Sequence, residues 1–202
     1  MDASPPPPLP KPQKIPMSNA RKLLIAFTIV VGLLCLGLTF LRMEDFIRPF
    51  SIPTRAMVPT LSPGDHVMME RFTFLARKPR RGDLVVFKTD GIESLPGGEI
   101  YVKRIAGLPG EHLRISEGKL FINNTQVALS NAAGEITYLL PLGSEAMRPT
   151  TTLIVPRGEY FVLGDNSTNS SDSRFWGGVP HKNVIGRIWF RYWPADRIGA
   201  VR

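Results

Sequence analysis

The apolar run LLIAFTIVVGLLCLGLTFL occupies residues 23–41 and carries no charged side chain. A helix rises about 1.5 Å per residue, so this run reaches roughly 28 Å, close to the ~30 Å hydrocarbon core of a bilayer. A cleaved secretory leader has a shorter apolar part, of about 7–15 residues, and ends at a small-x-small site. Here the run leads into Arg42, Met43 and Glu44 instead. It therefore predicts a transmembrane helix over residues 23–41, between an N-terminal tail and a larger C-terminal domain.

The tail, residues 1–22, is rich in proline and basic side chains and includes the run PPPP at 5–8. Such a composition cannot bury a core, so we expect a disordered tail. The tail holds four basic residues and one acidic residue, whereas the flank RMEDFIR at 42–48 is balanced. Because basic flanks stay on the cytoplasmic side, the tail is predicted to be cytoplasmic and residues 42–202 extracytoplasmic. The expected location is the inner (plasma) membrane, crossed once, with the lipid bilayer as a partner.

The composition excludes several classes of function. Hydrophobic residues make up 43% of the 202 residues and charged residues 21%, which provides enough apolar material for a packed domain. The single cysteine, Cys35, rules out an intrachain disulfide and a cysteine-based zinc site. His66, His112 and His181 show no metal-ligand spacing, so no metal or other cofactor is expected. The net charge of +8 comes with no zinc-finger, homeodomain or RNA-recognition signature, so no nucleic-acid partner is expected.

The C-terminal domain reads as a series of short β-strands. Its apolar runs are brief and are separated by turns that contain Gly, Pro or Asn, with no long stretch of helical periodicity. The segment 130–152 is polar and irregular, and we interpret it as an insertion or a long hairpin. The predicted fold class is mostly β, a single N-terminal transmembrane helix followed by an all-β domain. The expected strands are 84–87, 100–105, 112–115, 119–122, 125–127, 160–163 and 184–193.

Four segments carry the candidate chemistry: SIPTRAMVPTL (51–61) with PGD (63–65), RGD (81–83), YVKRIAGLPGE (101–111) and GDNSTNSSDSR (164–174). In this order they resemble type I signal peptidase (leader peptidase), the family of membrane-bound endopeptidases that remove signal peptides from exported preproteins. The resemblance covers about residues 52–193. It implies a β catalytic domain with a serine–lysine dyad that cleaves after a small-x-small site.

The resemblance assigns a role to each candidate catalytic position. Ala56 occupies the place of the nucleophilic serine, directly before Met57 and three residues before Pro59. Lys103 matches the general base, Thr54 the hydroxyl of the oxyanion hole, and Ser170 the serine that orients the lysine. Asp172 and Arg174 are expected to form a structural ion pair near the site. The walls of the shallow pockets for small side chains correspond to Ile52, Pro53, Met57, Leu61 and Val102.

The residues around Lys103 are also compatible with a role as general base. A lysine with the ordinary pKa of ~10.4 is neutral in under about one molecule in a hundred at pH 8, so a basic role requires burial. Its neighbours Tyr101, Val102 and Ile105 are apolar or aromatic. Strand alternation points Lys103 and Arg104 to opposite faces, so that one can be buried while the other is solvated. From the residues alone, an exposed strand lysine is the alternative.

The chain departs from the family pattern at three positions. Arg55 stands where many members have a small residue, and Ser167 where many have arginine. More importantly, the methyl group of Ala56 cannot attack a carbonyl, so the chain is predicted to be inactive. The alanine is either an introduced change or the mark of a natural inactive relative; we favour the former because the other catalytic positions match.

Three functions follow from these observations. The first is a signal peptidase in an inactive form. The second is a pseudo-peptidase that binds signal peptides or protein-export machinery without cleaving, and the third is an anchored β module that organises a complex.

Overall fold

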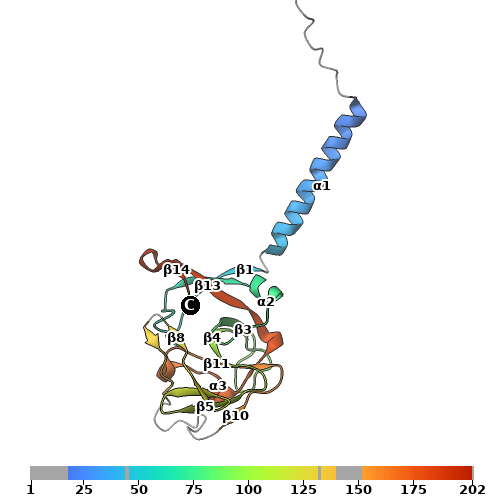
Figure 1. Ribbon diagram of the computed structural model, residues 1–202. Coiled ribbons are helices and arrows are strands. Elements are labelled where there is room, and N and C mark those ends of the chain that lie inside the picture. Colours follow the sequence, from blue (N-terminus) through green and yellow to red (C-terminus); the bar gives the residue numbers. More distant parts are fainter. Residues whose placement is uncertain (1–17, 44–45, 132, 140–151, 202) are drawn as a thin grey trace, which may run out of the picture. The chain divides into compact units, whose positions relative to one another are not determined.

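The computed structural model describes residues 18–43, 46–131, 133–139 and 152–201. The chain divides into two compact units, Met1–Met43 and Glu44–Arg202, each described here by itself (Figure 1). The predicted disordered tail falls mainly on residues 1–17, which lie outside the described residues.

The described part of the first unit is one helix, α1 (Asn19–Met43). It contains the whole predicted run and begins four residues earlier, because the backbone amides of Arg21 and Lys22 bond the carbonyl oxygen of Ser18 at 3.0 and 3.1 Å. Arg and Lys are good helix formers, so the basic flank continues the helix. The stretch Asn19–Thr39 is long and apolar enough to cross a membrane, and it fits a membrane anchor.

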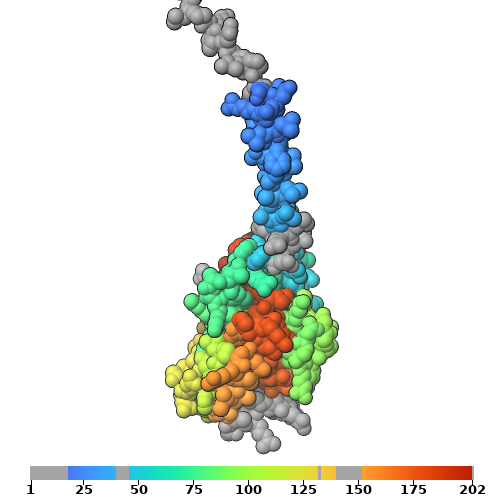
Figure 2. Space-filling model, turned by 90° about the vertical axis from the view of Figure 1, so that its right-hand side faces the viewer, coloured from blue at the N-terminus to red at the C-terminus, as the bar shows by residue number. Residues whose placement is uncertain are grey.

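The second unit is built on one large antiparallel sheet. Its strands lie in the order β1-β2-β13-β3-β4-β11-β12, and β14 pairs with β13. The middle of the sheet joins distant parts of the chain, since the late strand β13 pairs with both β2 and β3. Figure 2 shows the same on the surface, where orange-to-red segments lie between green ones. The strands of this sheet are β1 (Ile47–Ser51), β2 (His66–Glu70), β3 (Leu84–Lys88), β4 (Ile100–Gly107), β11 (Glu159–Leu163), β12 (Val179–Pro180), β13 (Val184–Trp193) and β14 (Gly199–Ala200).

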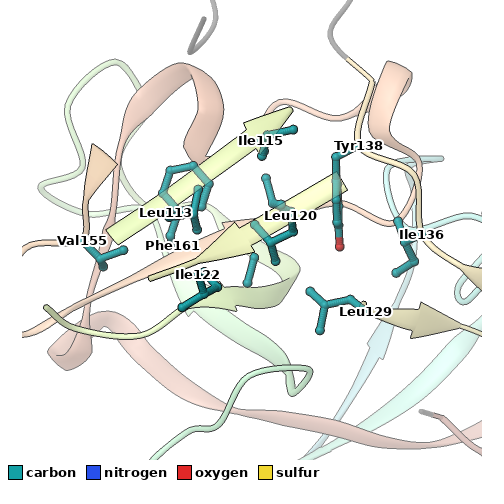
Figure 3. Close-up of a cluster of buried hydrophobic side chains, with 11 residues drawn as sticks. Leu113, Ile115, Leu120, Ile122, Leu129, Ile136, Tyr138, Val155 and Phe161 are labelled. Atoms are coloured by element: carbon teal, nitrogen blue, oxygen red, sulfur yellow. The ribbon is translucent and has the colours of Figure 1, made fainter. Parts of the chain in front are cut away.

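A smaller sheet completes the core. Its order is β10-β5-β6-β7, and Figure 1 shows β5 and β10 at the far end of the unit from β1 and β13. A hydrophobic cluster between this sheet and the large one joins Leu113 and Leu120 to Phe161 (Figure 3). The strands outside the large sheet are β5 (His112–Ser116), β6 (Lys119–Ile122), β7 (Thr125–Val127), β8 (Ser130–Asn131), β9 (Gly134–Glu135) and β10 (Leu153–Ile154).

The fold-class prediction is confirmed, because an N-terminal apolar helix precedes a mostly β unit. Each expected strand corresponds to an observed one. No expected strand covers β1, β2, β10, β12 or β14, while β8 and β9 fall within the predicted insertion or long hairpin. Pro49 interrupts the pattern of β1, and it is tolerated there because β1 lies at the end of the sheet. Short helical turns also occur, namely α2 (Phe72–Ala76), η1 (Ser167–Asn169), α3 (Ser173–Trp176), η2 (His181–Asn183) and η3 (Ala195–Arg197).

The segment 130–152 is only partly described. It begins with the two-residue strands β8 and β9, which pair as a short hairpin. Ile136 and Tyr138 then enter the hydrophobic cluster, and Figure 3 shows both near Leu129. This stretch therefore contributes to the core, while the rest of the predicted insertion, residues 140–151, lies outside the described residues.

Gly107 offers a test of the packing between the two sheets. A Cβ at this position would lie 2.8 Å from Leu113 Cδ1 and 3.0 Å from atoms of both Phe161 and Val155. Because three buried side chains would have to move, Gly107→Ala should lower the free energy of unfolding of the full chain in detergent by about 1–3 kcal/mol. Guanidinium unfolding followed by tryptophan fluorescence measures it. The control Gly97→Ala meets only Asp90 Oδ1 at 3.5 Å and should change stability little; equal effects would contradict the packing.

Candidate active site

A groove of about 400 Å³ with a mostly apolar lining opens on the second unit. One wall comes from the end of β1 and the loop after it, and the other from the first half of β4. The loop between β11 and α3, residues 164–172, supplies the remaining contacts. The lining residues are Phe50, Ser51, Ile52, Pro53, Thr54, Ala56, Met57, Glu99, Ile100, Tyr101, Val102, Lys103, Asn169 and Ser171.

The first half of β4 has one unpaired edge beside this groove. Residues 100–104 pair with β3, whereas β11 pairs only with Arg104, Ile105 and Gly107. Within the described ranges no other strand pairs with residues 100–103, and β1 pairs with β2 alone. Strand edges offer free backbone N–H and C=O groups, so this groove can take an extended peptide through main-chain hydrogen bonds.

Lys103 lines the groove and is 5% exposed. Its ammonium Nζ donates a hydrogen bond of 3.0 Å to Ser170 Oγ. Burial lowers the pKa of Lys103 to about 8, and the nearby carboxylate of Asp172 opposes that shift. The structure thus brings together two predicted site residues that are far apart in sequence, and it places in the groove a lysine whose pKa is lowered to about 8.

Ala56 and Thr54 line the same groove as Lys103. Ala56 is buried, and its carbonyl oxygen accepts a 3.0 Å hydrogen bond from the amide of Asn166. The side chain of Asn166 also donates to the carbonyl oxygen of the exposed Arg55 at 3.0 Å. These bonds fix the backbone at position 56 against the 164–172 loop. The Arg55 side chain is not among the groove residues.

Arg104 corrects one expectation from strand alternation. It points away from Lys103 as predicted, but it is 2% exposed rather than solvated. Its guanidinium makes a two-point ion pair with Asp165, Nε–Oδ1 2.8 Å and Nη2–Oδ2 2.6 Å, and the hydroxyl of Thr60 donates to the same carboxylate. Because Asp165 from the 164–172 loop compensates the charge of Arg104, β4 can bury a basic side chain on each of its two faces.

Asp172 and Arg174 form a second buried ion pair, with Nε–Oδ1 and Nη2–Oδ2 distances of 2.8 Å. Asp172 also accepts the amide of Gly164 at 3.0 Å. Ser167 is buried beside them, because its hydroxyl accepts from Arg174 Nη1 and donates to the carbonyl oxygen of Leu139, both at 2.8 Å. The serine at this position therefore joins the loop to residue 139.

The predicted pocket residues separate into two groups. Ile52, Pro53, Met57 and Val102 line the groove. Leu61 does not; it is 0% exposed and packs in the core, because residues 57–61 form a turn closed by a 2.8 Å bond from its amide to the carbonyl oxygen of Met57. Sequence reasoning also missed lining residues on β1, on β4 and in the loop. Counting back from Lys103 along its strand would have found Ile100 and Tyr101 on β4, whereas Glu99 lies directly before that strand.

A further cluster holds the loop after Ala56. Asp65 is 1% exposed, and its carboxylate accepts from Arg197 Nη1 at 2.9 Å, from Arg191 Nη1 at 3.3 Å and from the amide of Ser62 at 2.9 Å. Arg191 also donates to the carbonyl oxygen of Thr60 at 3.0 Å. Strand β13 and the helical turn η3 therefore support the segment that follows position 56.

These features define a mostly β protein in which a buried lysine lines a groove that can take a peptide and donates a hydrogen bond to a serine hydroxyl. The chain belongs to the family described as signal peptidase, peptidase S26, which matches residues 21–193.

The chain is also similar to individual proteins whose names include processing peptidase or signal peptidase I. Probable thylakoidal processing peptidase 2 of Arabidopsis thaliana is 40% identical over 157 residues, covering 76% of this chain and 40% of that protein. Probable signal peptidase I-2 of Synechocystis is 36% identical over 149 residues, covering 73% and 64%. Probable signal peptidase I-1 of the same organism is 33% identical over 195 residues, covering 95% and 90%. A solved signal peptidase I from Enterococcus faecalis matches 55% of this chain and 97% of its own, with 29% identity and a TM-score of 0.41. The chain thus spans less than two thirds of the first two relatives.

Gly164 tests how tightly the site is assembled. A Cβ there would clash with Ser170 Oγ and would lie 2.6 Å from both Ser170 Cβ and the carbonyl oxygen of Ala56. Gly164→Ala should therefore separate these groups and lower the free energy of unfolding by about 1–3 kcal/mol, measured by guanidinium unfolding of the full chain. In the double variant with Ser170→Gly, the removal of the Ser170 side chain should recover part of that loss. Simple addition of the two single effects would contradict the close contact.

Proposed function

We propose that this chain is a membrane-anchored serine endopeptidase of the signal peptidase I type, held inactive by alanine at position 56. One observation carries the proposal: Lys103 is buried, bonds Ser170 and lines the same groove as Ala56. A neutral lysine amine can activate a serine hydroxyl for acyl transfer, and with serine at position 56 Lys103 would be the amine in the same groove as that hydroxyl. The substrates proposed are signal peptides of exported preproteins.

With serine at position 56, each group has one task. The serine oxygen attacks the scissile carbonyl while the neutral Lys103 Nζ takes its proton. The Thr54 hydroxyl and the backbone N–H of residue 56 donate to the oxyanion that develops. Lys103 then gives the proton to the leaving amine of the substrate. In the second step the neutral side chain of Lys103 takes a proton from water, and that water hydrolyses the acyl-enzyme. Ser170 keeps Lys103 in position throughout.

The groove accounts for the small-x-small preference. A peptide extended along the free edge of β4 points alternate side chains to one face, so the first and third residues before the scissile bond share the apolar wall. Met57 and Val102 line this wall, and we expect it to exclude larger side chains by contact rather than by charge.

The second candidate is a natural pseudo-peptidase that binds signal peptides, or export machinery that presents them, without cleavage. The intact groove and the retained backbone N–H at position 56 favour binding in either case. The two candidates differ only in whether Ala56 is native, which the codon in the source gene decides.

Restoring the nucleophile tests the catalytic proposal. Ala56→Ser should create cleavage of a preprotein in detergent after a small-x-small site, where this chain has essentially none. Loss of a serine nucleophile costs on the order of 10⁶-fold in rate, so the gain should be large. Mass spectrometry of the products locates the cut. A folded Ala56→Ser protein that cleaves no signal peptide at any pH would favour the pseudo-peptidase.

Two variants of the restored enzyme separate the roles. Adding Lys103→Ala should abolish cleavage, because no neutral amine is left to take the serine proton; adding Ser170→Ala should weaken it less. Only the deprotonated lysine is a base, so activity should rise as pH increases through about 8, the lowered pKa of Lys103. A rate that falls over this interval would contradict the assignment.

We further propose that α1 crosses the inner (plasma) membrane once, with the tail cytoplasmic and the β unit extracytoplasmic. The motivation is the excess of basic residues before the apolar run. Protease added to spheroplasts should digest the domain after Arg42 and leave the tail protected. Activity of a C-terminal reporter that works only in the cytoplasm would overturn this orientation.

A further inference from the structure

We propose that Glu99 selects substrates with a basic side chain at the fourth or fifth residue before the scissile bond. The proposal rests on the proposed function, because it requires a peptide in the groove. It adds a charge preference at a distance from the small-x-small site.

The substrate position that meets Glu99 follows from the place of this residue relative to β4. Glu99 lines the groove directly before β4, four residues from Lys103. An extended chain advances about 3.3 Å per residue, so Glu99 lies roughly 13 Å along the strand from the lysine. Beyond Lys103 the edge of β4 is occupied by β11, so the open edge runs from Lys103 toward Glu99. Since the small residues that precede the bond occupy this part of the groove, its far end meets residues four or five positions before the bond.

The preference for a basic side chain follows from the charged residues that line the groove. Among the described residues that line the groove, the ionisable ones with a formal charge at neutral pH are Glu99 and Lys103. Lys103 is engaged with Ser170, while Glu99 is exposed and, within the described ranges, has no basic side chain within 4 Å of its carboxylate. The neighbouring acid Asp90 is already an acceptor for the amide of Gly98 at 2.7 Å. The carboxylate of Glu99 is thus available to a ligand.

Peptide binding to the chain as it stands tests the proposal, since Ala56 prevents turnover. Labelled peptides with Ala-x-Ala before the bond would carry Lys, Gln or Glu at the fifth residue before it, and anisotropy would give their affinities. At low salt the Lys peptide should bind about fivefold more tightly than the Gln peptide, and the Glu peptide less tightly than either. The preference should shrink at 0.5 M salt, because screening weakens exposed pairs.

Two variants locate the effect. Glu99→Gln should remove the ranking of the three peptides. Glu93→Gln, an exposed acid of the same loop that does not line the groove, should preserve the ranking. A ranking that survives Glu99→Gln would overturn the proposal. So would a series of peptides with lysine at successive positions before the bond in which the tightest binding occurs outside the fourth and fifth positions. Failure of every Ala-x-Ala peptide to bind would instead count against the proposed function.

Discussion

The guanidinium of Arg104 is the point on which the rest of the site depends. It pairs with Asp165 on the 164–172 loop and donates to the carbonyl oxygen of Gly82 at 2.9 Å, and the hydroxyl of Thr60 donates to the same carboxylate. Each of the four chemistry-bearing segments therefore contributes one group to this buried network. Removing one partner of such a pair leaves an uncompensated buried charge, which costs on the order of 3–5 kcal/mol. The network fixes the segments relative to one another before any substrate contact is made.

The network also explains the properties of Lys103. Because alternate residues of β4 face opposite ways, the strand that inserts Arg104 into the network turns Lys103 toward the groove. The partners differ on the two faces, a carboxylate for Arg104 and an uncharged hydroxyl for Lys103. The arginine therefore stays charged in a salt bridge, while burial without a direct acidic partner lowers the pKa of the lysine.

Much of this could be predicted from the sequence. The apolar run, the expected strands and the positions of Lys103, Ser170 and Ala56 were evident from local patterns and the family resemblance. The prediction that Leu61 lines a pocket was wrong, because a turn after Ala56 directs that side chain into the core. The expectation that Arg104 is solvated was also wrong, because Asp165, the partner that permits its burial, is 61 residues away. It also missed Glu99, whose place at the groove depends on which edge of β4 remains unpaired.

The sequence by itself determined the division into an apolar helix and a β unit, and the presence at position 56 of alanine, which has no hydroxyl. These properties depend on hydrophobic length, strand period and side-chain identity, which act locally. The tertiary structure decided that Lys103 reaches Ser170, that β4 keeps a free edge and that Gly164 leaves room for both Ser170 and Ala56. Such features require antiparallel pairing between strands far apart in the chain, so no local pattern of residues encodes them.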